Sequence, residues 1–330
     1  MLDLMSLNPT TISRDLKGKL VMLYGMPKVG KTSLSAQFPK NLILGFEHGW
    51  NALANTYAVD VTSWAEFKRY LKQLEKPEAK EKFNTITIDT IGIAWTACEG
   101  YICQQNGVQK ISDIPWGQGY SACTKEFENT LRKIIQAGYG LVIIAHDEIR
   151  KEQGPNDTEI LCHSPNIPKR AYGIVNQLVD IIGYIDCEYD EQGNGHRYIY
   201  TRKTPTIMAG SRFPYLKPKI EFGYQQLVDA IGDAIDKAAE LDNAKVVDHA
   251  EVIEKEVLDY NKIKARAEEL FTQLVINQTP DIQLQNHQRI MKKCEILFGH
   301  PIDKLSSITE DQVEIFNLVV EEMEEMAKNG

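Results

Sequence analysis

The sequence predicts an α/β protein in which helices cover a parallel sheet, followed by a small helical domain. Two observations predict this fold class. Short runs rich in Ile, Val and Leu alternate with longer amphipathic stretches, and from about Gln225 onward nearly every segment has helical propensity. A chain of 330 residues is long enough for one large core and a small appendage. We therefore expect a core domain over 1–230, an acidic helical connector over 231–260 and a helical, partner-binding domain over 261–330.

The central sheet is predicted from four apolar runs whose composition is typical of strands buried on both faces. They are Leu20–Tyr24, Leu42–Phe46, Thr85–Asp89 and Leu141–Ala145. Between them, Ser63 and Glu66 have capping-box spacing, which predicts a helix through about Glu75. A second helix is predicted over Ser121–Ala137, ended by Gly138.

The pattern then changes to that of an antiparallel pair. Val179–Glu188 and His196–Arg202 flank the turn-rich segment 190–195, so we expect a hairpin that extends the sheet.

The last hundred residues differ from the rest in charge and periodicity. Residues 231–330 contain 11 Lys and Arg against 21 Asp and Glu, whereas the preceding part is nearly neutral. The overall charge of −9 therefore does not exclude a nucleic-acid groove in the core. Two apolar stripes at helical spacing predict a small bundle: Ile263, Ala267, Leu270, Phe271 and Leu274, and Val313, Phe316, Val320 and Met323.

Several classes of protein are disfavoured by composition. We find no apolar run of the roughly 18–20 residues that a membrane helix needs, and no N-terminal secretory pattern, so a cytoplasmic protein is expected. The six cysteines form no CxxC pair, which argues against a zinc ribbon or a disulfide framework.

The most specific motif is a phosphate-binding loop between a predicted strand and a helix. The segment Gly25-Met26-Pro27-Lys28-Val29-Gly30-Lys31-Thr32 matches G-x-x-x-x-G-K-[ST], and Ser33 follows it. Its glycines allow backbone N–H groups to face phosphate oxygens. Lys31 is expected to bridge the β- and γ-phosphates as an exposed loop residue, and Thr32 to offer its hydroxyl to Mg²⁺.

Three more polar residues follow predicted strands. Asp89 closes Thr85–Asp89, where a second magnesium ligand is expected, although an Asp there also suits a turn. Glu47 could orient an attacking water or be a solvated loop residue. His146 could sense the γ-phosphate or be a structural histidine.

On these residues the chain resembles RecA-fold P-loop ATPases, and specifically phage single-strand annealing proteins built on a RecA-like core. The resemblance covers roughly residues 17–230 and rests on the loop, Asp89 as the Walker B carboxylate, and Phe46-Glu47-His48-Gly49. It implies that Glu47 activates water and that His146 is the γ-phosphate sensor, where the family usually has Gln. It also implies ATP and Mg²⁺ as ligands, and the host cytoplasm as the location if a phage encodes the chain.

The resemblance further implies two DNA-binding loops, over Asn106–Tyr120 and Asp147–His163. Their candidate contact residues are Lys110, Trp116, Arg150 and Lys151. The alternative for Trp116 is a loop anchor packed on the core.

Basic residues near the end of the second hairpin strand resemble those that RecA-type assemblies extend to a neighbouring subunit's nucleotide. Arg202 and Lys203 are the candidates, with Lys169, Arg170 and Arg212 as competitors, and the alternative is a solvated strand end.

The leading hypothesis is an ATP-dependent recombination protein that binds single-stranded DNA and assembles with nucleotide between subunits. Its acidic helical domain would bind a protein such as a single-strand-binding protein or a nuclease. The alternatives are a replication motor or helicase loader, a non-enzymatic nucleotide switch and, least favoured without an Arg-rich lid segment, a small-molecule kinase. No Asn-Lys-x-Asp motif is present, which favours ATP over GTP.

Overall fold

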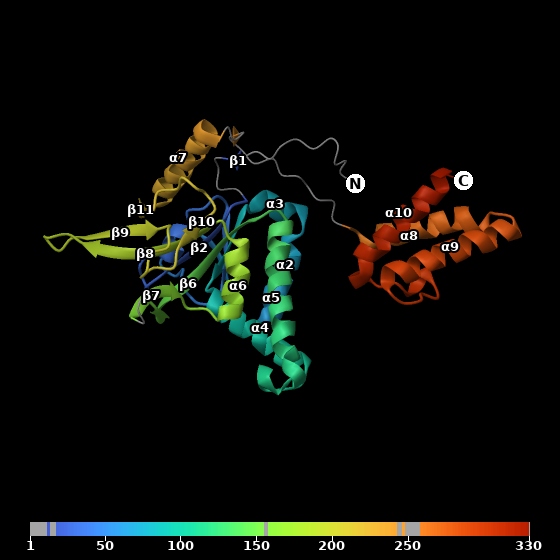
Figure 1. The fold of residues 1–330 in the computed structure, drawn as a ribbon, viewed down its shortest axis with the longest axis horizontal. Helices are drawn as coiled ribbons and strands as arrows, with labels where there is room; N and C mark the ends of the chain where they lie inside the picture. Colours follow the sequence, from blue (N-terminus) through green and yellow to red (C-terminus); the bar gives the residue numbers. More distant parts are fainter. Residues whose placement is uncertain (1–11, 14–17, 155–157, 243–245, 248–257, 330) are drawn as a thin grey trace. The chain divides into compact units, whose positions relative to one another are not determined.

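The computed structural model describes residues 12–13, 18–154, 158–242, 246–247 and 258–329 (Figure 1). The chain divides into two compact units, residues 1–253 and 254–330, and each is described by itself.

The first unit contains strands and helices in alternation. Its strands are β1 (Ile12–Ser13), β2 (Leu20–Gly25), β3 (Asn41–Gly45), β4 (Tyr57–Asp60), β5 (Thr85–Asp89), β6 (Gly140–Gln153), β7 (Glu159–Pro165), β8 (Ile181–Tyr189), β9 (Gly195–Tyr200), β10 (Gly210–Ser211), β11 (Lys219–Glu221) and β12 (Val246–Val247). Its α-helices are α1 (Lys31–Ser35), α2 (Trp64–Leu74), α3 (Pro77–Lys82), α4 (Ile91–Gln105), α5 (Gln118–Gln136), α6 (Lys169–Leu178) and α7 (Tyr224–Asp242). The 3₁₀ turns η2 (Ile111–Asp113) and η3 (Pro115–Gly117) connect α4 to α5.

The sheet has the predicted parallel centre and antiparallel extension. Among the described residues its order is β11-β9-β8-β2-β6-β5-β3-β4, and the strands from β8 to β4 are parallel. β9 pairs antiparallel with β8, and β11 pairs antiparallel with β9. The predicted α/β architecture is therefore confirmed.

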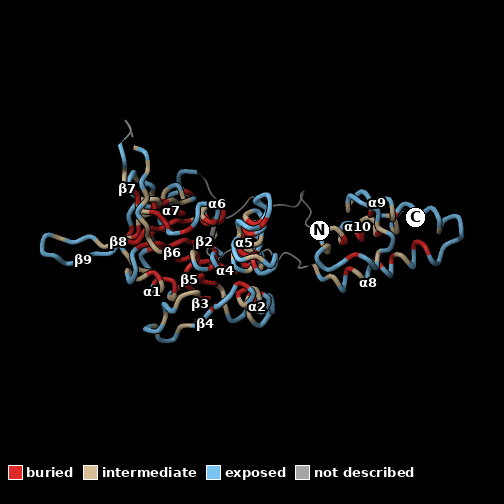
Figure 2. Tube along the Cα trace, turned by 90° about the horizontal axis from the view of Figure 1, so that it is seen from below, coloured by how far each residue is buried: buried red, intermediate tan, exposed pale blue. Residues whose placement is uncertain are grey.

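Both faces of the sheet are covered, which explains the continuous apolar runs of its strands. Every residue of β2 and β5 is buried, and Figure 2 shows burial concentrated in these central strands. One face packs against α1 and α7, through Leu34 and Leu227 among others. The other packs against α2, α4, α5 and α6 (Figure 1).

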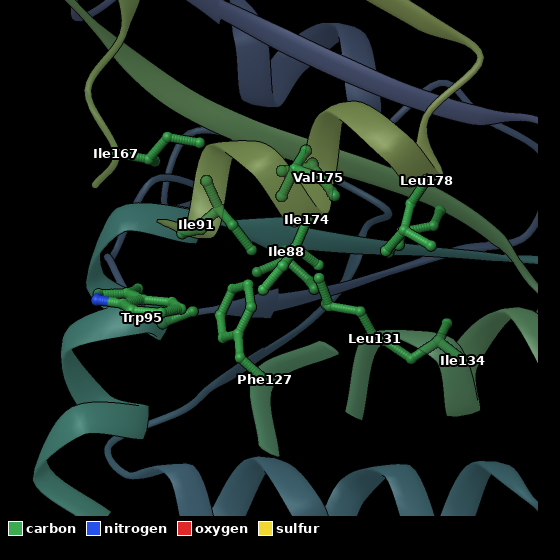
Figure 3. Close-up of a cluster of buried hydrophobic side chains, with 14 of the residues drawn as sticks. Ile88, Ile91, Trp95, Phe127, Leu131, Ile134, Ile167, Ile174, Val175 and Leu178 are labelled. Carbon is green, nitrogen blue, oxygen red and sulfur yellow. The ribbon is translucent and has the colours of Figure 1, made fainter. Parts of the chain in front are cut away.

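The helices on this second face, α4, α5 and α6, pack together against β5, the strand that ends at Asp89. Figure 3 shows α4, α5 and α6 contributing Trp95, Phe127 and Ile174 around Ile88 of β5. The rings of Trp95 and Phe127 meet edge to face at 5.0 Å. Both helices that flank the connection between α4 and α5 are therefore packed on the core.

The boundary predicted at residue 230 falls inside a helix of the core. The apolar face of α7 includes Ile231 and Ile235, which belong to the same buried cluster as the P-loop strand. The acidic residues of α7 are exposed, and their negative charge is the feature from which the sequence predicts a connector here. Residues 243–245 and 248–257 of the predicted connector lie outside the described residues.

The segment predicted as a second loop is a β-hairpin. β6 continues as one strand from Gly140 to Gln153 and pairs antiparallel with β7, with Asp147 opposite Pro165. Exposed and half-buried residues alternate in the outer part of this arm. It therefore has no continuous apolar run like the one that identifies the inner part of β6.

The second unit is a small helical bundle. It contains α8 (Tyr260–Phe271), a π-helical turn η5 (Thr272–Ile276), α9 (Pro280–Phe298), the 3₁₀ turns η6 (Leu305–Ser307) and η7 (Glu310–Gln312), and α10 (Val313–Asn329). The two predicted stripes meet in one buried cluster that includes Leu270 and Phe316. Among the residues described, no helix combines the length and apolarity needed to cross a membrane.

Candidate active site

The phosphate-binding loop connects the end of β2 to the start of α1. Gly30 has φ 109°, a left-handed conformation that L side chains rarely adopt, and Lys28 has φ 66°. The Nζ of Lys31 donates to the carbonyl oxygens of Gly25 and Met26, both at 2.8 Å. The loop therefore closes around the lysine it is expected to present to phosphate.

Lys31 is buried, with 5% of its surface exposed, so the expectation of an exposed lysine was wrong. Burial lowers its pKa, although the carboxylates of Asp89 and Glu47 act in the opposite direction. The loop curls back over its own lysine, a feature that the motif spacing does not reveal.

The two predicted magnesium ligands lie together. The Oγ1 of Thr32 donates to Oδ2 of Asp89 at 2.8 Å, joining the start of α1 to the end of β5. Gly49 closes over them, because a Cβ at this position would lie 3.0 Å from Asp89 Oδ2 and 3.2 Å from Thr32 Oγ1. A hydroxyl and a carboxylate oxygen held side by side are ligands that Mg²⁺ prefers, so Thr32 and Asp89 would hold this ion.

Asp89 is expected to reduce the stability of the unliganded protein. Burial raises its pKa, and the hydrogen bond from Thr32 offsets only part of this effect. A raised pKa in the folded state means that stability falls as pH rises through that pKa and the carboxyl ionises. We therefore expect Asp89→Asn to raise the melting temperature by a few degrees at pH 7 without Mg²⁺.

Thermal unfolding followed by circular dichroism checks this expectation. The difference between the proteins should shrink as the pH falls through the raised pKa of Asp89, because the native carboxyl then takes up its proton. A lower melting temperature for the variant at pH 7 would contradict it.

Glu47 and His146 form a pair on either side of the Asp89 strand. β5 lies between β3 and β6, and Nε2 of His146 is 3.0 Å from both carboxylate oxygens of Glu47. The carboxylate faces Nε2, so that nitrogen must carry the proton. The Nδ1 atom is buried and, among the described residues, has no hydrogen-bond partner.

The environment of Glu47 suits a residue that activates a water molecule. Its side chain is 34% exposed and borders an open cavity of about 350 Å³. Thr90, directly after Asp89, lies 3.4 Å from its Oε1 through the threonine hydroxyl. A carboxylate so placed can accept a proton from water, and a bound Mg²⁺ would supply charge neutralisation on the phosphates.

A second polar cluster beside the pair was missed. Asp147 follows His146, and its Oδ2 lies 2.6 Å from Nδ1 of His163 on β7. The hydroxyl of Tyr184 lies 3.1 Å from the same nitrogen. The signal was weak because Asp147 and His163 are sixteen positions apart and meet only through the unexpected hairpin.

The geometry of Arg202 differs from the expectation of a finger reaching another subunit. Its guanidinium donates to carbonyl oxygens of the loop that follows: those of Ser211, Phe213, Pro214 and Leu216. Among its competitors, Arg212 donates to Asp180 at 3.2 Å and to the carbonyl of Gln177. Lys203 is exposed and, within the described residues, has no ion-pair partner, so its role stays a prediction.

A cation that the sequence did not single out lies at the loop instead. Arg197, near the start of β9, donates through Nη1 to the carbonyl of Val29 at 3.1 Å. β9 is antiparallel to β8, with Arg197 opposite Cys187 and Tyr200 opposite Tyr184. The beginning of β9, rather than its end, therefore lies at the sheet edge where the loop sits.

The predicted DNA-contact residues have different surroundings. The guanidinium of Arg150 contacts Glu148 and donates to the carbonyl of Ile167 at 2.8 Å, so it holds the hairpin to the segment before α6. Lys151 pairs with Glu159 across the hairpin at 2.8 Å. Lys110 and Trp116 lie on the connection between α4 and α5, and both are exposed.

A family model described as an AAA domain matches residues 17–213. The SPbeta prophage-derived uncharacterized protein YorG of Bacillus subtilis (strain 168) is 26% identical over 340 residues, covering 98% of this chain and 98% of its own.

Two solved structures share a limited part of their geometry with the chain. The KaiC-like protein PH0186 of Pyrococcus horikoshii OT3 has a TM-score of 0.32 and 14% identity, covering 57% of this chain and 80% of its own. The flagellar accessory protein FlaH of Methanocaldococcus jannaschii has a TM-score of 0.34 and 11% identity, covering 63% and 85%.

Proposed function

The chain belongs to the AAA domain family of P-loop ATPases, and on that premise we propose that it hydrolyses ATP while bound to single-stranded DNA in phage recombination. The similarity to a prophage-derived protein supports a phage context. The Glu47–His146 pair beside the Thr32–Asp89 pair supports hydrolysis, because a non-enzymatic nucleotide switch needs no group that activates water.

The observation that carries the DNA part of the proposal is the exposure of Trp116. This side chain is 94% exposed, so it does not anchor its loop on the core. Trp side chains are highly buried on average, and exposed aromatic side chains are the platforms on which unpaired bases stack. The connection that carries it projects from the sheet between α4 and α5 (Figure 1).

Cations suited to a phosphate backbone lie on the same side. The guanidinium of Arg170, at the start of α6, lies 4.8 Å from the ring centre of Tyr120, at the start of α5. Lys110 lies on the same connection as Trp116, Lys169 precedes Arg170 at the start of α6, and both lysines are exposed. One aromatic platform with a few cations suits a single strand, whose backbone needs charge and whose bases need a flat partner.

The same proposal includes assembly. Nucleotide would lie between subunits, with Lys203, Lys169 or Arg170 of a neighbouring copy contributing the additional cation. The second unit would bind a protein such as a single-strand-binding protein or a nuclease, because residues 254–330 contain 9 Lys and Arg against 15 Asp and Glu, and this excess of negative charge repels a DNA backbone.

We expect Trp116→Ala to weaken binding of a fluorescent single-stranded oligonucleotide roughly tenfold, since one stacked base contributes about 1–3 kcal/mol. Fluorescence anisotropy with ATP and Mg²⁺ measures the dissociation constant, and binding should weaken steeply as salt increases. Tyr189→Ala, which removes another aromatic that is 73% exposed, is the matched control.

Steady-state hydrolysis with and without the oligonucleotide separates the alternatives. Stimulation that is lost in Trp116→Ala supports the proposal. Hydrolysis that does not respond to DNA, together with equal DNA affinity in Trp116→Ala and Tyr189→Ala, would exclude the proposed DNA-dependent activity and favour a loader or a switch.

A further inference from the structure

Arg197 is a cation at the phosphate loop without a carboxylate partner in the described part of the chain. Its Nη1 is occupied by the carbonyl of Val29, and its guanidinium carbon lies 4.1 Å from the ring centre of Phe222. The residue is nevertheless exposed. A guanidinium that lies over an aromatic ring and donates to a backbone carbonyl is oriented by its surroundings, and its exposure leaves it accessible to a ligand.

This stack contacts the loop at the glycine that shapes it. A Cβ at Gly30 would lie 2.6 Å from Nη1 of Arg197 and 2.8 Å from Cζ of Phe222. Gly30 directly precedes Lys31 and Thr32, which are expected to contact phosphate and magnesium. A nucleotide held by the loop would therefore have part of its structure close to Arg197.

The position of the stack in the sheet indicates which part of the nucleotide this is. β2 lies between β6 and β8. The groups suited to the terminal phosphate, Glu47 after β3, Asp89 on β5 and His146 on β6, lie on one side of β2, whereas Arg197 on β9 lies beyond β8 on the other. A triphosphate whose terminal phosphate faces Glu47 must extend its nucleoside away from that side.

We propose that Arg197, backed by Phe222, is the nucleobase platform of this ATPase, with the base stacked on the open face of the guanidinium. The planar, delocalised guanidinium stacks on rings, and bases are held in this way in other nucleic-acid contacts. Phe222 keeps the plane fixed, so little ordering is needed when the base arrives. The inference rests on the proposed nucleotide site and is independent of DNA.

The test compares two ligands that share the phosphates and differ in the base. The probes are the non-hydrolysable ATP analogue adenylyl imidodiphosphate and inorganic triphosphate, each titrated calorimetrically with Mg²⁺ and without DNA. In Arg197→Ala we expect the analogue to bind roughly tenfold more weakly, and triphosphate affinity to stay within about twofold. Arg197→Lys should lose nearly as much as Arg197→Ala, because an ammonium group has no plane to stack.

Arg132→Ala is the matched control, because it removes an exposed arginine of α5 that pairs only with Glu128 among the described residues. Circular dichroism establishes that each variant is folded. Equal losses for both ligands would assign Arg197 to holding the loop and overturn the proposal. Full affinity in Arg197→Lys would show that charge alone matters and would also overturn it. Failure of the unchanged protein to bind the analogue would overturn the nucleotide site itself.

Discussion

Lys31→Ala is expected to reduce ATP hydrolysis by a factor on the order of 100 or more, because one preorganised charge is removed from the developing charge on the phosphates. Nucleotide affinity should fall as well. The structure also predicts that the substitution lowers the stability of the folded protein. The carbonyls of Gly25 and Met26 lose their donor, which costs about 1–3 kcal/mol where water cannot replace it. Removal of a buried cation whose pKa is lowered offsets part of that cost.

Steady-state phosphate release and thermal unfolding test both parts of this expectation. The melting temperature should change by only a few degrees. Lys80→Ala, which removes an exposed lysine of α3, should match the wild-type protein in both measurements. Hydrolysis at the wild-type rate in Lys31→Ala would exclude this loop as the reaction site.

Glu47→Gln is expected to lower the turnover number by roughly 100- to 10,000-fold, the range typical of a general base. ATP binding should be retained, because the change removes a proton acceptor and leaves the loop intact. The amide oxygen of Gln can still accept from Nε2 of His146, so the side chain should keep its position. Loss of turnover with retained affinity is the signature of a group that acts in the chemical step.

Turnover and calorimetric ATP affinity should be measured together. Glu78→Gln, on α3, is the matched control because it makes the same change on an exposed helix. Turnover within a few-fold of wild type would show that Glu47 is not the base. A parallel loss of affinity would indicate a binding role instead.

The parts of the fold that the sequence predicted are those determined by local pattern. The inner strands were found because burial on both faces demands uninterrupted apolar residues, as in β5, whose observed and predicted bounds agree. Ser63 caps α2 through the N–H of Glu66 at 3.2 Å, while the Glu66 carboxylate accepts from Thr62 rather than Ser63. The capping-box spacing thus correctly predicted where the helix begins. The return hydrogen bond to Glu66 comes from the residue before the expected one.

The parts that were missed depend on partners distant in sequence. The hairpin of β6 and β7 has no apolar run of its own and is defined by pairing. Arg197 was not recognised because its relation to Val29 depends on the register of β9 against β8 and on the pairing of β8 with β2, which the hairpin pattern does not give. In each case the residue type was visible, and the partner with which the strand pairs was not.

The length of β6 has a mechanical consequence. The strand is continuous from Gly140 to Gln153, so the buried core segment, His146 and the outer arm share one extended backbone. An extended, paired strand is stiff along its axis and contains no loop in which a displacement could dissipate. A displacement of the arm along this strand would therefore act directly on the backbone of His146, whose imidazole is hydrogen-bonded to the Glu47 carboxylate.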